Sequence, residues 1–181
     1  MAICAATCAT SVPDNDFDAC KIAPRDGGLA RAIFIACDYV FTDITDLGEW
    51  TTAIAANSIH STGRIKGQLP AGTTTTTKFT SCDPEQVTGR VNTMTFIDYN
   101  KSATGLDFDF YDEFEAAPDN YRIALLDCDN NLYGIIDSFS SQSDYVIPED
   151  KKEPASWNVT LTFEGRLPKP QNIAGLDAIL G

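Results

Sequence analysis

The segment SWNVTLTFEGRL, residues 156–167, decides the fold class of this chain. Its apolar residues Trp157, Val159, Leu161 and Phe163 alternate with polar ones. Successive side chains of a strand point to opposite faces, so this alternation predicts a strand with one buried and one solvated face. Because the clearest element of the chain is a half-buried strand, we expect a sheet-based protein whose other elements pack around that sheet.

Working outward from this segment, runs of β-forming residues and turn residues predict further strands. The strands are expected in residues 30–41, in 89–100, on both sides of the turn DCDNN within 121–139, and in 143–148. The Thr-rich residues 63–82, broken by glycines and a proline, are expected to form short extended pieces.

Two segments have helical spacing of their apolar residues. Residues 46–56 begin with Asp46 and Glu49 in the pattern of a capping box, and Asn57 can end the helix in the left-handed region. Residues 106–118 alternate in part like a strand, but their length and acidic start favour a helix that Pro118 ends.

These elements predict a mainly β fold: an antiparallel β-sandwich, or a partly closed barrel, with one or two short helices and extended terminal arms. We expect an N-terminal arm over residues 1–29, a β-sandwich domain over 30–166 and a C-terminal arm over 167–181. Both Trp50 and Trp157 fall in apolar stripes and are expected in the core.

The composition narrows the class of function. The 181 residues carry a formal net charge of −13, which argues against a surface that grips nucleic acid through clustered Lys and Arg. No apolar run approaches the roughly 20 residues that span a bilayer, so no membrane association is expected. The first residues lack a basic n-region, which indicates folding in a cytoplasm with most of the six cysteines reduced.

The residue pattern matches no common catalytic or metal site. His60 is the single histidine, and its polar surroundings suggest a surface or capping role. The spacing of Cys4, Cys8 and Cys20 matches no common zinc pattern. The acidic stretches DNDFDA and DCDNNL lack the glycine and glutamate of a calcium loop. No phosphate-binding glycine motif occurs, so we expect no enzyme, no catalytic residue, no cofactor and no metal.

Apolar terminal segments and unpaired strand edges favour assembly. The tail ends in IAGLDAIL, which a lone domain would rather bury, and extended edges can be completed by another chain. We therefore expect copies of the chain to associate with one another, as in rings and tubes of identical subunits.

Several stretches resemble small virion proteins of tailed phages that infect Bacteroidetes, the crAss-like group included. The likeness covers roughly residues 30–166 and lies in DYVFTDITDLGEWTTAIAAN, GQLPAG, SCDPEQVTGRVNTMTFIDYN and FYDEF. The element order is also similar to the tail-tube and tail-ring fold, a β-sandwich flanked by a helix that assembles into rings around a DNA channel.

The resemblance implies a structural subunit of a tail, neck or tail-barrel ring. The partners would be further copies of the chain, neighbouring virion proteins and DNA that passes without specific binding, in a virion assembled in the bacterial host cytoplasm. The Thr-rich region would be the inter-subunit loop, and the oligomer-interface candidates are Thr73, Thr75, Thr77, Ile173, Leu176, Ile179 and Leu180.

Acidic residues would line the channel and repel phosphate, with some of those in 107–119 or 144–153 facing the lumen. The candidates are Asp107, Asp109, Asp112, Glu113 and Glu115. A capsid-decorating or head-fibre protein is an alternative within the same class. A ligand- or surface-binding β-sandwich module is an alternative of another class.

Overall fold

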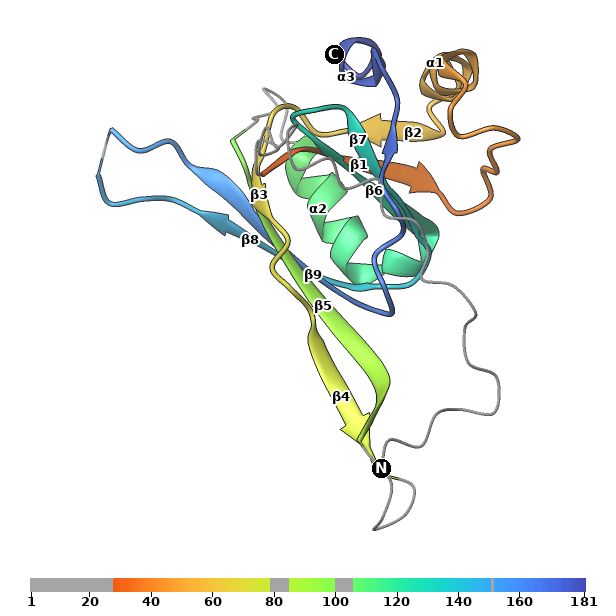
Figure 1. The fold of residues 1–181 in the computed structure, drawn as a ribbon. Coiled ribbons are helices and arrows are strands. Elements are labelled where there is room, and N and C mark those ends of the chain that lie inside the picture. Colours follow the sequence, from red (N-terminus) through yellow and green to blue (C-terminus); the bar gives the residue numbers. More distant parts are fainter. Residues whose placement is uncertain (1–27, 79–84, 100–105, 151) are drawn as a thin grey trace, which may run out of the picture.

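The fold is seen in a computed structural model that describes residues 28–78, 85–99, 106–150 and 152–181 (Figure 1). Within these residues, ten strands and three short helices follow one another, with one 3-10 turn, η1, before β6. The strands are β1 (Leu29–Ala36), β2 (Ile59–Ser61), β3 (Lys66–Gln68), β4 (Thr73–Thr77), β5 (Gln86–Asp98), β6 (Tyr121–Asp127), β7 (Asn131–Ile136), β8 (Ser140–Val146), β9 (Ser156–Glu164) and β10 (Gln171–Asn172). The helices are α1 (Leu47–Ala55), α2 (Leu106–Ala116) and α3 (Leu176–Ile179), and η1 covers Pro118–Asn120.

The fold is mainly β, as predicted, and its strands form one large antiparallel sheet. The strand order is β10-β7-β6-β1-β3-β5-β9-β8, with β2 paired to β1 and β4 paired to β5. Among the described residues this sheet does not close into a barrel, so that alternative is wrong. Three helices pack on the sheet where one or two were expected.

The sheet buries apolar side chains on both faces. One core cluster lies between the sheet and α2 and includes Phe34, Met94, Phe96 and Phe114. The second core cluster lies on the opposite face, under α1 and α3, and Ile33 belongs to it. Since Ile33 and Phe34 are successive residues of β1, this central strand is buried on both faces.

The alternation in β9 is confirmed. Trp157, Val159, Leu161 and Phe163 are buried against α2, whereas Asn158 is exposed. Trp50 and Trp157 are both in the core, as expected. The strand therefore contributes apolar side chains to one face of the sheet and polar ones to the other.

Helix α1 begins at its predicted cap. The Asp46 carboxylate accepts a hydrogen bond from Gly48 N at 2.8 Å, and Asn57 follows the helix with a φ of 56°. The Glu49 carboxylate accepts from the backbone N–H groups of Thr42 and Asp43 instead of closing the box on Asp46. Asp46 thus caps the start of the helix, and Glu49 ties the first helical turn to the preceding loop.

Residues 167–181 do not form the extended arm that we expected. β10 pairs with β7 in the sheet, and α3 packs beside α1 on the second core cluster. In Figure 1 the C-terminus accordingly lies on the body, next to α1. Residues 1–27 of the expected N-terminal arm lie outside the described residues, and the structure begins at Gly28, just before β1.

Two cysteines of the described part are exposed and lie outside the strands. Cys37 follows the end of β1, and Cys128 lies in the turn after β6, where both side chains are exposed. The predicted strand over 30–41 was too long because Tyr39 and Phe41 leave the sheet and pack against the second core cluster. No helix of the described part is long and apolar enough to span a membrane.

Candidate functional site

The feature of this fold that has no core of its own is the hairpin of β4 and β5. Strand β5 has 13 residues, and its second half pairs with β9 and β3 inside the body. Its first half continues beyond the body and pairs with β4, from Thr73 opposite Val91 to Thr77 opposite Gln86. We call the part made of residues 73–77 and 86–91 the projecting hairpin; Figure 1 shows it extending away from the body.

Every residue of the projecting hairpin is exposed, on both faces. Val87 is 62% exposed, and the hydroxyl bonds of this region among the described residues run across the ribbon, as from Thr88 Oγ1 to the Thr75 carbonyl at 3.3 Å. A two-stranded hairpin without a packed face is marginally stable in water. The projecting hairpin therefore gains little stability from burial within the described part of the chain.

The base of the projecting hairpin depends on a close approach of two chain segments. A Cβ at Gly72 would lie 2.2 Å from Asn92 Oδ1 and 2.8 Å from the Val91 carbonyl oxygen. Only glycine fits at this distance, so Gly72 lets the chain turn from β3 into β4 against β5. On the other side of β5, Asn92 Nδ2 donates to the Gly165 carbonyl at 2.8 Å, which ties the base to the end of β9.

Two strand edges of this half of the sheet have no strand beyond them among the described residues. Locally the order is β4-β5-β9-β8, so β4 and β8 are the outer strands. Unpaired backbone groups at such edges can bond to another chain. At the end of β8, Val146 and the following Ile147 expose apolar side chains, and Ile147 is 76% exposed.

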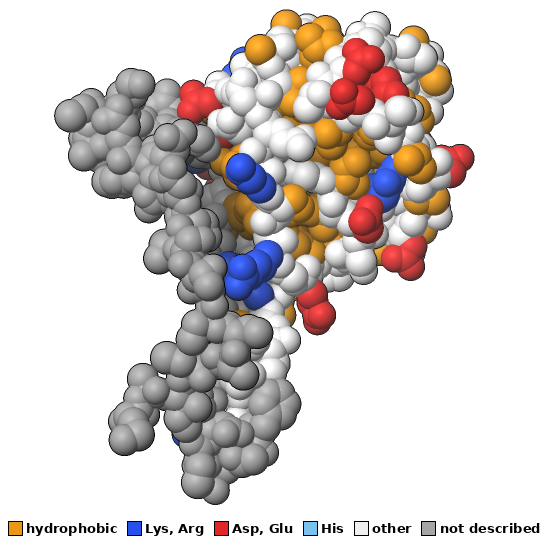
Figure 2. All heavy atoms as spheres, turned by 45° about the vertical axis from the view of Figure 1, so that its right-hand side comes forward, with side chains coloured by type: hydrophobic (Ala, Val, Ile, Leu, Met, Phe, Trp, Pro, Cys, Tyr) orange, Lys and Arg blue, Asp and Glu red, His pale blue; other side chains and the backbone are white. Residues whose placement is uncertain are grey.

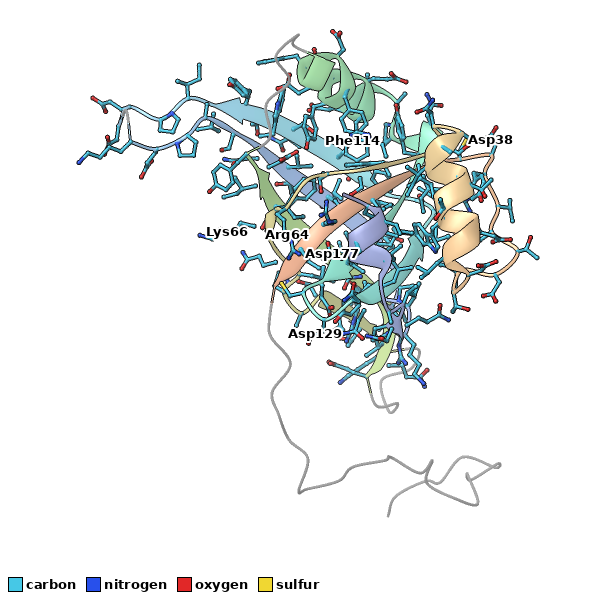
Figure 3. All side chains as sticks on the ribbon, turned by 90° about the horizontal axis from the view of Figure 1, so that it is seen from above. Asp38, Arg64, Lys66, Phe114, Asp129 and Asp177 are labelled. Atoms are coloured by element: carbon cyan, nitrogen blue, oxygen red, sulfur yellow. The ribbon has the colours of Figure 1, made fainter. Side chains whose placement is uncertain are left out.

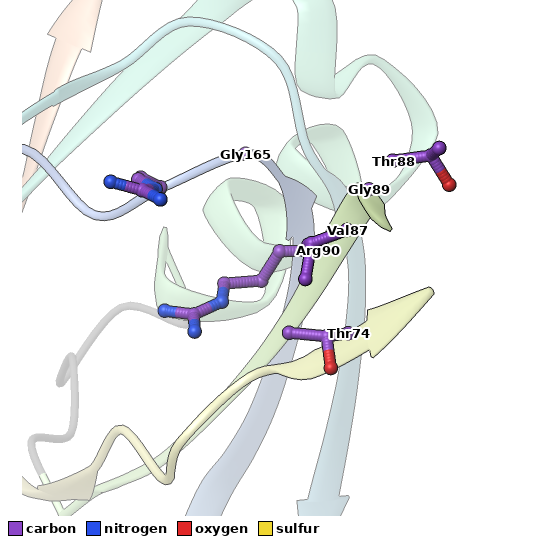
Figure 4. Close-up of a pocket in the computed structure, with 7 residues that line it drawn as sticks. Thr74, Val87, Thr88, Gly89, Arg90 and Gly165 are labelled. Atoms are coloured by element: carbon purple, nitrogen blue, oxygen red, sulfur yellow. The ribbon is translucent and has the colours of Figure 1, made fainter. Parts of the chain in front are cut away.

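A pocket with two arginines lies at the base of the projecting hairpin (Figure 4). Its volume is about 290 Å³, and Arg90, Arg166, Thr74 and Thr88 contribute the polar side chains of its lining. Gly165 N donates to the Arg90 carbonyl at 2.9 Å, so the strand segments that carry the two arginines are joined. Neither guanidinium has a hydrogen-bond or ion-pair partner in the described part of the chain.

The sequence-predicted interface candidates fall into two groups. Thr73, Thr75 and Thr77 all lie on β4 and are exposed on the projecting hairpin. The four C-terminal candidates lie in the chain's own core region instead. Ile173 and Leu176 are 3% and 0% exposed, and Ile179 and Leu180 pack against the same cluster.

Ile173 and Leu176 are thus covered by their own chain, which leaves them little surface for a neighbour, whereas Ile179 and Leu180 stay half-buried. A buried arginine helps to hold this C-terminal segment in place. Arg31 Nε donates to Asp177 Oδ1 at 2.6 Å, and its other nitrogens bond to the backbone oxygens of Thr62 and Gly181. Arg64 binds the second oxygen of Asp177, and Figure 3 shows these two side chains meeting.

The acidic candidates lie on α2, which forms as predicted. Asp107 accepts a hydrogen bond from Trp157 Nε1 at 3.1 Å, and Glu115 accepts from Ser143 N at 2.8 Å. Both are thus engaged within the chain. Asp109 and Asp112 are exposed one turn apart on the outer side of the helix, while Phe114 on the inner side lies in the core (Figure 3).

Glu113 is also exposed, and it interacts with Tyr121. Burial, followed by the hydrogen bond and charge of Glu113, raises the pKa of the Tyr121 hydroxyl.

His60 is exposed on β2, as predicted, beside the ring of Phe110 at a centroid distance of 5.3 Å. It borders a shallow hollow of about 220 Å³ together with Glu113 and Tyr121. Among the described residues that line this hollow, no serine or cysteine nucleophile lies within hydrogen-bond distance of a base, as nucleophilic catalysis by such a residue would require. In the described residues no group of three or more His, Cys, Asp or Glu side chains is placed to hold a metal ion.

The acidic turn DCDNN has a structural use. Asp127 Oδ1 accepts from the N–H groups of Asp129 and Asn131, and Oδ2 accepts from Asn131 Nδ2 and Tyr133 Oη. Burial opposes the charge, but these four hydrogen bonds outweigh it and hold the pKa of Asp127 below its ordinary value. The carboxylate therefore closes the β6–β7 turn. The other stretch with calcium-loop spacing, DNDFDA, lies outside the described residues.

The arginine pocket was missed by sequence reasoning. Arg90 and Arg166 lie 76 positions apart and belong to no motif, so only the pairing of β5 with β9 brings them together.

On the face shown in Figure 2, a group of basic side chains lies where the rounded body narrows toward its lower extension, and most acidic ones lie farther up or to the right. The charge of this acidic chain is thus unevenly distributed.

Comparison of the chain with protein-family models, with curated proteins and with solved structures found no match.

Proposed function

We propose that this chain is a structural, non-enzymatic subunit that assembles with copies of itself into a ring of a tailed-phage virion. The observation that carries the proposal is the projecting hairpin, which is exposed on both faces and has no core of its own. In a ring, each copy would lay this hairpin on its neighbour and so bury surface that the single chain leaves in water.

The free edges of β4 and β8 support the same assembly. They are the two outer strands of the half-sheet β4-β5-β9-β8 and run antiparallel to their inner neighbours. Edge pairing between copies would supply backbone hydrogen bonds, and the bent sheet around α2 would be the sandwich-like body that the resemblance implies.

The placement in a virion rests on the resemblance to small virion proteins of Bacteroidetes-infecting tailed phages. A tail, neck or tail-barrel ring surrounds the DNA channel, and a net charge of −13 would keep DNA from adhering to such a ring. Neighbouring virion proteins would contact its upper and lower surfaces. A capsid-decorating or head-fibre position is the alternative within this class.

The binding-module alternative receives less support. Modules that bind carbohydrate use exposed aromatic side chains, and both tryptophans of this chain are buried. The exposed aromatic residues among the described ones include Tyr99 and Phe108, which border different elements from the projecting hairpin.

The decisive experiment shortens the projecting hairpin and leaves the body intact. Thr74 and Arg90 are cross-strand partners, so replacing residues 75–89 by Asn-Gly joins them through a two-residue turn. We expect closed rings of the full chain in electron microscopy and mass photometry, and a folded monomer of the shortened chain. A full chain that stays monomeric at high concentration, or a shortened chain that still forms rings, would contradict the proposal.

The virion placement has its own test. Peptides of this chain should be found in purified particles of the phage that encodes it, and an antibody against the chain should label the tail or neck. Label spread over the head would favour decoration, and absence of the chain from particles would remove the virion part while leaving ring formation open to the first experiment.

A further inference from the structure

We infer that the arginine pocket at the base of the projecting hairpin binds the Asp109 and Asp112 carboxylates on α2 of a neighbouring copy. This inference rests on the proposed assembly and names the two surfaces that meet. The ligand class is a pair of carboxylates on a helix, and the partner is a second copy of this chain.

Two arginines of the described part lack an acidic partner. The three other arginines of the described part, Arg31, Arg64 and Arg122, each lie within 4 Å of an aspartate. Arg90 and Arg166 have no such partner there, although the whole chain has 26 acidic residues for 13 basic ones. Two unpaired guanidinium groups in one pocket are suited to bind anionic groups from outside the chain.

Hydrogen bonds join the chain segments that carry the two arginines. The Gly165 N–H bonds to the Arg90 carbonyl, and the Gly165 carbonyl accepts from Asn92, so the two segments are fixed to each other. Thr74 and Thr88 line the same pocket (Figure 4), and the Thr88 hydroxyl already donates to the Thr75 carbonyl across the hairpin. A site whose backbone is already held loses little freedom when it binds.

Asp109 and Asp112 are distinguished by forming an exposed pair on one helix. Several other exposed acids of the described part are already engaged: Asp43 bonds to Thr45, Asp46 caps α1, and Asp137 lies beside Arg122. Others, such as Asp38, Glu149 and Glu164, have no side-chain hydrogen-bond partner in the described part, but they do not lie one turn apart on a helix. Asp109 and Asp112 are exposed and have no hydrogen-bond partner among the described residues. Phe110 and Phe114 pack against the core, so the helix presents both carboxylates from a fixed position.

The spacing of the two aspartates matches the spacing of the two arginines. Residues three apart on a helix have Cβ atoms about 5–6 Å apart. Adjacent strands such as β5 and β9 lie about 5 Å apart, and Arg90 and Arg166 come from these two strands or their ends. Two carboxylates one turn apart can therefore each meet one guanidinium.

The contact is heterologous, because the pocket of one copy meets the helix of the next. A contact of this type closes into a ring or continues as a filament. The inference assigns Asp109 and Asp112 to the subunit contact, not to the channel lining that the sequence suggested for them.

The test reverses charges on each side and then on both. Arg90→Glu with Arg166→Glu, and separately Asp109→Arg with Asp112→Arg, should each raise the protein concentration needed for assembly by roughly tenfold or more. The quadruple variant, with all four charges reversed, should regain much of the assembly. A 1:1 mixture of the two double variants should also form hetero-oligomers, although neither assembles alone.

The matched control reverses two other exposed positive charges. Lys66→Glu with Lys152→Glu changes the net charge as much as the arginine variant does, and the Lys66 side chain lies on β3 (Figure 3). We expect this variant to assemble near the wild-type concentration. Circular dichroism and thermal unfolding of every variant separate loss of contact from loss of fold.

Four results would overturn the inference, and they can be told apart. Unchanged assembly of the arginine variant would leave the ring proposal standing but remove this contact. Loss in both double variants without rescue in the quadruple variant would show that the two surfaces do not meet. Binding of a 30-base-pair DNA duplex that disappears in the arginine variant would assign the pocket to nucleic acid. A wild-type chain that never assembles would remove the proposed function and this inference together.

Discussion

Asp127 shows how one buried carboxylate can hold a turn of this fold. It accepts four hydrogen bonds from the residues that connect β6 to β7, and Asn130 adopts a φ of 61° within the same turn. Aspartate and asparagine tolerate this backbone conformation, so the stretch DCDNN supplies both the turn geometry and its hydrogen-bond acceptor.

Asp127→Asn should lower the free energy of unfolding by about 1–3 kcal/mol at pH 7, because an amide cannot accept all of these bonds. The pKa of Asp127 in the folded chain is below its unfolded value of 3.8. Its contribution is therefore present above about pH 4 and is lost as the pH falls through the folded pKa.

Urea unfolding at pH 7 and pH 3 measures both effects. The wild type should lose more stability than the variant between these pH values. Asp129→Asn, next to it in the exposed part of the turn, serves as the control and should change little. Equal stability of the wild type and Asp127→Asn at pH 7 would contradict the role assigned to the carboxylate.

A buried tyrosine gives the opposite pH dependence. The Tyr111 hydroxyl donates to Asp98 Oδ2 at 2.8 Å, and burial first, then the charge of Asp98, raises the pKa of Tyr111 above its ordinary value of 10.0. Its contribution is present below about pH 10 and is lost as the pH rises beyond that value toward the folded pKa.

Tyr111→Phe should lower the free energy of unfolding by about 1.5–3 kcal/mol at pH 7, since the lost bond goes to a carboxylate. It should also lose less stability than the wild type between pH 9 and pH 11. Thermal unfolding across this range is the measurement, and Tyr99→Phe, at an exposed tyrosine, is the control. A steeper alkaline loss in Tyr111→Phe than in the wild type would contradict the argument.

At the scale of elements, the patterns that predicted β9, α1 and α2 succeeded because each combines periodicity with a local signal. β9 alternates apolar and polar residues, α1 begins at Asp46, and α2 ends shortly before Pro118. The choice of helix for residues 106–118 was correct because Phe110 and Phe114, one turn apart, both pack on the sheet.

The C-terminal segment shows the limit of the same reasoning. The apolar residues of IAGLDAIL correctly predict burial, but the sequence does not state which surface covers them. Asp177 accepts a hydrogen bond from a buried arginine of β1 that lies 146 positions away. This contact helps to fix the segment on the chain's own core. A segment's apolarity indicates that it needs a partner; the partner depends on which distant residues the fold brings near it.

Asp177→Ala should release α3 from the body. It would leave the buried Arg31 guanidinium without its anion, which typically costs about 3–5 kcal/mol. Hydrogen exchange should then speed up in residues 173–181, and thermal stability should fall. Arg64→Ala removes only an exposed partner of Asp177 and should cost less than about 1 kcal/mol. Unchanged exchange in Asp177→Ala would show that apolar packing alone holds α3.

At the scale of the whole molecule, the body and the projecting hairpin have different energetic roles. The body buries two core clusters on opposite faces of one sheet. The projecting hairpin is exposed throughout, so it adds little to the stability of the single chain while it adds surface for a neighbour.

The variant in which Asn-Gly replaces residues 75–89 should therefore unfold, as a monomer, within about 1 kcal/mol of the wild-type monomer. Urea unfolding at a concentration below that of assembly measures this difference. At assembling concentrations the wild type should gain stability and the shortened chain should not, because association stabilises the folded state by mass action. A large loss of monomer stability would mean that the hairpin belongs to the core of the body.

Alternation in residues 156–167, the cap at Asp46 and the turn at residues 127–131 are local, and so each could be inferred from neighbours in the chain. Three other features depend on residues far apart in the chain. They are the joining of ten strands into one open sheet, the docking of residues 167–181, and the placement of Arg90 and Arg166 around one pocket. Periodicity specifies how a segment is oriented toward a core, since it depends on residues two to four apart. Which surfaces meet is set by long-range pairing and packing, and this is why the exposure of the projecting hairpin and the arginine pocket became visible only in three dimensions.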